Sequence, residues 1–128
     1  MRFILSILTI IYLSLSVAAQ SSPTDSVRIN DLFFTYVSKN LTLNKSQASS
    51  LKPHVNKYLQ ERRNVIKAHK DPLERERKIA DLKIKYRKQF TPIIGVEKAN
   101  AFFAQEQNFR RQVREELRKR KNKSLNIN

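Results

Sequence analysis

The side chains that could carry out catalysis are few and poorly spaced for it. The chain of 128 residues contains two histidines, no cysteine and one glycine. The residue types that build nucleophilic triads and glycine-rich phosphate-binding loops are therefore scarce or missing. Glu115 and Glu116 are adjacent within an expected helix and point apart, which does not suit a shared acid–base pair. We expect no enzymatic activity.

The two histidines also make a poor metal site. His54 and His69 are fifteen residues apart, and no further histidine, cysteine or methionine is clustered with either. Two ligands on one helix are usually three or four residues apart, so that both face the metal. We predict no metal site and no other cofactor.

The residue types that stand out are basic and aromatic, which suits binding. The formal net charge is +15 at pH 7, and the stretches QERRNVIKAHK and RERKIADLKIKYRKQF interleave Arg and Lys with apolar residues. Such a face attracts acidic segments at long range and offers apolar contact through the side-chain stems. A solvated charged face is the alternative for the basic residues, and core or dimer burial for the phenylalanines. The candidate partner-binding residues are Arg62, Arg63, Lys67, Lys83, Lys85, Arg87, Phe33, Phe34, Phe102 and Phe103.

The first nineteen residues are typical of a Sec signal peptide. Arg2 precedes an uncharged apolar run, and small residues follow up to Ala19. The run of about 15 residues is shorter than the roughly 20 that span a bilayer, although an uncleaved anchor is the alternative. We expect cleavage near Ala19 and a periplasmic mature protein. In that location the positive charge favours acidic proteins, anionic lipid or envelope polysaccharide over nucleic acid as partners.

Apolar residues recur at helical spacing through the rest of the chain, and turn-forming residues are rare. The sequence therefore predicts an all-α fold of one short and three longer helices. Pro53 lies inside the second of these and is expected to kink it, which favours an open, curved, cradle-like arrangement. We expect residues 20–120 to form a single domain and residues 121–128 a disordered basic and polar tail. The helices are predicted over residues 26–39, 45–70, 72–91 and 96–120.

The segment LNKSQ opens the second predicted helix. Asn44 can cap the first turn while Gln47 reaches back to the backbone of Asn44, as in a capping box. With the residues that follow, this segment resembles the Leu-Thr-x-x-Gln motif of the Spy/CpxP-like family of periplasmic helical proteins, in its Bacteroidetes-type form. A second motif, expected before the last helix, is degenerate, because Gly95 replaces Thr and Lys98 replaces Gln. The residues that match the family are Leu43, Asn44, Gln47, Pro53 and Tyr58.

This resemblance implies a function and an assembly. Family members act as ATP-independent chaperones or envelope-stress adaptors that bind partly unfolded or acidic proteins, often as cradle-shaped antiparallel homodimers. A homodimer also suits a small mature chain without disulfides. One alternative is a signalling module that senses envelope stress for a sigma-factor system or a membrane-bound regulator and has one envelope partner. A further alternative is a basic protein that binds anionic lipid at a membrane surface or envelope polysaccharide.

Overall fold

The computed structural model describes residues 23–126, which form four α-helices and no strand. The helices contain 18, 24, 23 and 30 residues, so the prediction of an all-α fold with one short and three longer helices is confirmed. Residues 1–19, the expected signal peptide with its cleavage site, lie outside the described residues. None of the helices within residues 23–126 is both long enough and apolar enough to cross a membrane. The helices are α1 (Pro23–Asn40), α2 (Lys45–Ala68), α3 (Pro72–Ile94) and α4 (Val96–Leu125).

The capping box predicted at the start of α2 is present. The Asn44 side chain accepts a hydrogen bond from the backbone N–H of Gln47 at 2.8 Å, and the Gln47 side chain accepts one from the Asn44 N–H at 3.2 Å. Thr42, just before the box, has a positive φ of 53°. Its carbonyl accepts a hydrogen bond from the Lys98 ammonium at 3.2 Å, which ties the α1–α2 connection to the first turn of α4.

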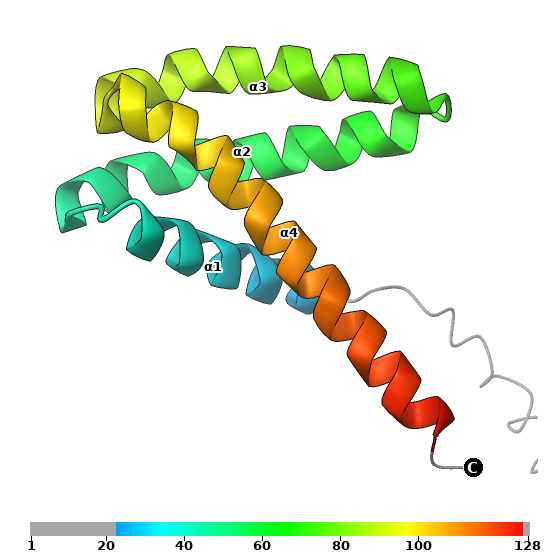
Figure 1. Cartoon of the computed structure of the whole chain (residues 1–128). Helices are drawn as coiled ribbons and strands as arrows, with labels where there is room; N and C mark the ends of the chain where they lie inside the picture. The colour runs from blue at the N-terminus through cyan, green and yellow to red at the C-terminus, as the bar shows by residue number, and fades with distance from the viewer. Residues whose placement is uncertain (1–22, 127–128) are drawn as a thin grey trace, which may run out of the picture.

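The connection between α2 and α3 is short. The Asp71 side chain caps α3 by accepting a hydrogen bond from the Glu74 N–H at 2.8 Å, and Pro72 occupies the first helical turn, where its missing N–H costs nothing. This short connection makes α2 and α3 an antiparallel hairpin (Figure 1).

The third helix was predicted to end at Thr91, before Pro92. It continues through Pro92 and ends at Ile94. Pro92 lacks the backbone N–H that would bond to the carbonyl four residues earlier, but helical bonding resumes after it, with the Gly95 N–H donating to the Thr91 carbonyl at 2.9 Å. Gly95 then has φ +84°, a backbone conformation that favours glycine. The degenerate second motif is therefore a sharp turn without a side-chain cap.

The fourth helix is longer than predicted. The expectation of a disordered tail is wrong for residues 121–125, which continue α4 as far as Leu125. The reason is local, because no glycine or proline occurs after Gly95 and the intervening Arg, Lys and Glu residues have good helix propensity.

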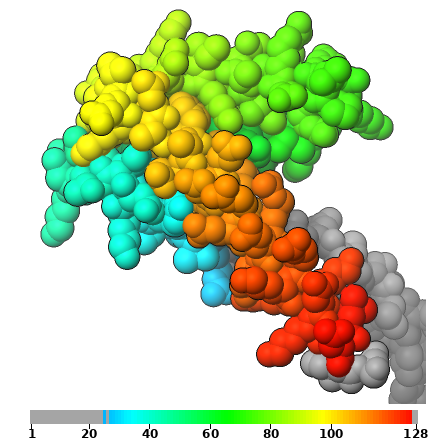
Figure 2. Space-filling model, viewed as in Figure 1, coloured from blue at the N-terminus to red at the C-terminus, as the bar shows by residue number. Residues whose placement is uncertain are grey.

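The helices form an open arrangement rather than a closed bundle. Figure 1 shows α1 beside the first part of α2, while α4 crosses the α2–α3 hairpin and runs on past α1. The far end of the hairpin and the last turns of α4 diverge, as Figure 2 also shows. The core lies where the four helices cross, and its largest fully buried apolar side chains are Tyr58, Tyr86, Phe90, Phe102, Leu51, Val37 and Val55.

Candidate binding sites

The four candidate phenylalanines belong to the core or pack against it. Phe33 and Phe102 are buried, with ring centroids 5.8 Å apart. Phe34 and Phe103 are half-buried against the same cluster. Core burial, the alternative expected for the phenylalanines, therefore describes Phe33 and Phe102, whereas Phe34 and Phe103 stay partly accessible.

The six candidate basic residues are distributed over three hollows and the exposed surface. Arg62 and Lys83 line a common pocket. Arg63 bonds to the Asn30 side chain and lines a hollow of about 200 Å³ between α1, α2 and α4. Lys67 and Arg87 are exposed, while Lys85 belongs to a second pocket. The structure thus brings together only part of the predicted basic surface.

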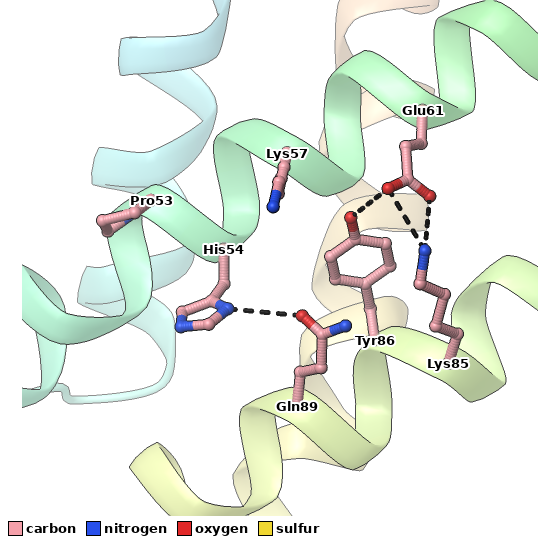
Figure 3. Close-up of a pocket in the computed structure, with 7 residues that line it drawn as sticks. All are labelled: Pro53, His54, Lys57, Glu61, Lys85, Tyr86 and Gln89. Atoms are coloured by element: carbon pink, nitrogen blue, oxygen red, sulfur yellow. Dashed lines mark hydrogen bonds and ion pairs between the residues drawn. The ribbon is translucent and has the colours of Figure 1, made fainter.

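The second pocket lies between α2 and α3 and has a volume of about 370 Å³ (Figure 3). The Lys85 ammonium contacts the Glu61 carboxylate at 2.9 Å, and the Tyr86 hydroxyl donates to the same carboxylate at 2.8 Å. On the other side of the pocket, His54 Nδ1 lies 3.3 Å from the Gln89 side-chain oxygen. These contacts link α2 and α3 across the pocket. We refer to the contacts of Lys85 and Tyr86 with Glu61 as the clip.

The hydrogen bonds of this clip also set its protonation. Bonds from Lys85 and then Tyr86 lower the pKa of Glu61 below its usual value. Burial, together with the bond to Glu61, raises the pKa of Tyr86 to about 12. The carboxylate is therefore charged and the phenol neutral near pH 7, so neither group is poised for proton transfer.

A more buried carboxylate lies between α2 and α4. Glu106 of α4 is 2% exposed, and it accepts a hydrogen bond from the Tyr58 hydroxyl at 2.6 Å. Arg110 donates to its other oxygen at 2.8 and 3.2 Å, while Arg62 Nε lies 3.6 Å from that oxygen. Burial, followed by the charge of Glu106, raises the pKa of Tyr58 well above its usual range. Sequence reasoning missed Glu106 and Arg110, since nothing in their local pattern indicates burial.

An apolar groove with a volume of about 570 Å³ lies between α1 and α4. Leu32 is 63% exposed and Leu117 60% exposed, although both are large apolar side chains. Sequence reasoning also missed this groove, even though apolar residues recur on both helices at three- and four-residue spacing, which is the signal that indicates it. Its apolar and aromatic lining consists of Ile29, Leu32, Tyr36, Phe109, Val113 and Leu117.

The groove is bordered by a strongly basic segment. We refer to residues 111–125 of α4 as the C-terminal arm, whose side chains are all exposed. The arm has two acidic residues, Glu115 and Glu116, and seven basic ones. It therefore carries a large excess of positive charge beside an apolar lining. The basic residues are Arg111, Arg114, Arg118, Lys119, Arg120, Lys121 and Lys123.

Metal-ligating side chains do not gather in residues 23–126, where no group of three or more could hold an ion. The two histidines lie in separate surroundings, His54 beside Gln89 and His69 with Nδ1 3.3 Å from the Glu74 carboxylate.

Comparison of the chain with protein-family models, curated proteins and solved structures finds no match. The Spy/CpxP-like resemblance stays a prediction from the motif residues.

Proposed function

We propose that the protein is an exported, chaperone-like or adaptor protein that binds partly unfolded acidic proteins without ATP. The observation that carries the proposal is the apolar groove between α1 and α4, with the basic C-terminal arm along it. The expected signal peptide and the motif around Asn44 agree with this assignment.

The groove has the composition of a docking surface for an apolar segment. Contiguous exposed apolar side chains on a small protein mark interaction sites more often than isolated ones do. Two helices that line one groove offer it to an amphipathic helix or an extended segment, whose apolar residues take up the positions beside Leu32 and Leu117.

Charge decides which kind of segment fits. An acidic segment is attracted by the arm, whereas a second copy of the arm is repelled by it. We therefore assign the groove to an acidic client. The homodimer stays a prediction for other surfaces of the chain, and light scattering at micromolar concentration tests it, with a monomer mass contradicting it.

An aggregation assay tests client binding directly. The mature protein is mixed in several-fold excess with a chemically reduced acidic protein at low salt, and light scattering follows aggregation. We expect a delay that shortens at high salt, because screening weakens attraction between exposed charges. No delay at low salt would contradict the proposal.

Two variants link the assay to the groove. Leu32→Asp with Leu117→Asp places negative charges on the apolar lining and is expected to abolish the delay. Leu73→Asp is the matched control, because Leu73 is also highly exposed but lies in the first turn of α3, outside the groove. Equal loss with the control would contradict the assignment of the groove.

A pull-down from envelope extract separates this function from the signalling alternative. Many denatured acidic proteins on the bait support a chaperone, and one stoichiometric partner supports a signalling module or adaptor. Binding to anionic lipid or polysaccharide alone supports the third function considered.

A further inference from the structure

A cationic pocket of about 230 Å³ lies where α2, α3 and α4 meet, apart from the lining of the apolar groove. Three helices contribute to it, with Arg62 from α2, Lys83 from α3 and four residues from α4. Four of the six lining side chains are basic and only one is acidic. The α4 residues are Glu106, Gln107, Arg110 and Arg114.

The Glu106 carboxylate already accepts hydrogen bonds from other side chains, and its single negative charge does not neutralise the four basic side chains of the pocket. One oxygen of Glu106 accepts the Tyr58 hydroxyl, and the other accepts two donors of Arg110. Arg62 is left with an ion pair at 3.6 Å, and its buried Nε has no hydrogen-bond partner among the described residues. The Arg62 guanidinium is therefore incompletely paired by Glu106, and its charge adds to the positive potential of the pocket.

The other two basic side chains of the pocket, Lys83 and Arg114, are also available to bind an anion. Within residues 23–126, neither Lys83 nor Arg114 forms an ion pair with a carboxylate. Burial, and then the neighbouring charge of Arg110, lower the pKa of Arg62, so the like charges oppose one another here. An anion among them offsets this repulsion.

We propose that this pocket binds a phosphate-type oxyanion, as inorganic phosphate or as a phosphate ester. Arginine guanidiniums present paired donors that match tetrahedral and planar oxyanions. Glu106 neutralises one of the four cations, so a doubly charged phosphate balances the pocket better than a single carboxylate does. The inference goes beyond the proposed client binding, because it concerns a different site and a small polar ligand.

Calorimetric titration with inorganic phosphate tests the proposal. It is performed on the mature protein at neutral pH, with chloride adjusted to keep the ionic strength constant. We expect saturable binding that Arg114→Gln and Lys83→Gln each weaken about tenfold, the effect of losing one charge-assisted contact. Both substituted side chains are on the rim and outside the buried Glu106 contacts, and circular dichroism confirms that the variants fold.

Two control variants keep the result specific. Arg118→Gln and Lys88→Gln each remove one exposed positive charge from the same two helices but outside the pocket. We expect both to bind phosphate within about twofold of the unmodified protein. Equal weakening by controls and pocket variants would overturn the proposal, because it would show attraction to net charge alone.

Vesicles identify the source of the phosphate group. Flotation compares phosphatidic acid vesicles with phosphatidylcholine vesicles, with and without added inorganic phosphate. Binding to phosphatidic acid that Arg114→Gln weakens and free phosphate displaces supports a lipid headgroup as the ligand. Saturable binding of free phosphate without vesicle binding supports a soluble phosphate or ester. No Arg114-dependent binding in either arm overturns the proposal.

Discussion

Two clusters in this protein are built from the same parts but lie in different surroundings. In the exposed clip, Tyr86 and Lys85 of α3 bond to Glu61 of α2. In the buried cluster, Tyr58 of α2 and Arg110 of α4 bond to Glu106. The carboxylate side chain is 36% exposed in the clip and 2% exposed in the buried cluster.

The surroundings of these contacts decide how much they contribute to folding stability. Exposed ion pairs contribute about 0–1 kcal/mol, because water screens them and ordering the side chains costs entropy. A buried pair contributes little net stability compared with apolar residues, but removing one partner costs about 3–5 kcal/mol because the other charge is left unpaired. We therefore expect the Lys85–Glu61 ion pair of the clip to contribute little to stability, and the loss of a partner in the buried cluster to be strongly destabilising.

The largest effect is expected from removing the buried carboxylate. Glu106→Gln leaves Arg62 and Arg110 close together without a negative charge and should lower the free energy of unfolding by about 3–5 kcal/mol. Glu61→Gln is the matched variant in the clip and should cost less than about 1 kcal/mol. Urea unfolding followed by circular dichroism measures both, and equal losses would remove the distinction between the clusters.

The two tyrosine hydroxyls give a smaller difference. Tyr58→Phe removes the donor to one oxygen of buried Glu106 and should cost about 1–3 kcal/mol. Tyr86→Phe removes the donor to a carboxylate that keeps Lys85 and solvent, and should cost about 0.5–1 kcal/mol. Thermal unfolding midpoints rank the variants, and a larger shift for Tyr86→Phe would reverse the comparison.

Alkaline pH probes the same hydroxyls without mutation. The folded state raises the pKa of both tyrosines from an ordinary value near 10, to about 12 for Tyr86 and higher for Tyr58. Their neutral forms are therefore favoured in the folded protein. The stability they contribute is fully present below pH 10 and is lost as pH rises through the folded values. We expect urea midpoints to fall above pH 10, and less steeply in Tyr58→Phe than in the unmodified protein. An unchanged slope would contradict this.

Acid pH gives the smallest effect. The pKa of Glu61 is lowered in the folded protein, so its contribution to stability is present above the usual value near 4.5 and is lost as pH falls below it. Because the side chain is partly exposed, we expect a change of less than about 1 kcal/mol that shrinks further in high salt. The difference in the free energy of unfolding between Glu61→Gln and the unmodified protein, measured with urea at pH 7 and pH 3, tests this prediction.

Sequence reasoning predicted what local chemistry controls. The cap at Asn44, the start of a helix at residue 72 and the start of another at residue 96 all follow from residues that act on their neighbours in the chain. Pro92 misled the prediction because packing of the last turn of α3 holds the helix together: Ile94 is buried in the core and Ile93 packs against it.

The sites depend on partners that are distant in the chain, and this is why they were harder to predict. Glu106 meets Tyr58 across 48 positions, so its burial follows from how α4 crosses α2. Arg62 and Lys83 were singled out for their charge, but the sequence does not show that α4 adds Arg110 and Arg114 to them. Likewise, Leu32 and Leu117 form one groove only because α1 and α4 lie side by side.

The length of the C-terminal arm has a consequence for the speed of association. Its fifteen residues span about 22 Å at 1.5 Å per residue, and its last turns extend beyond the other three helices (Figure 1). At physiological salt, charges are screened over about 8 Å. The field of the arm therefore begins well outside the helical body. Under the proposed function, an acidic client would be captured at the arm before it reaches the groove. Shortening the arm should slow encounter more than it hastens dissociation.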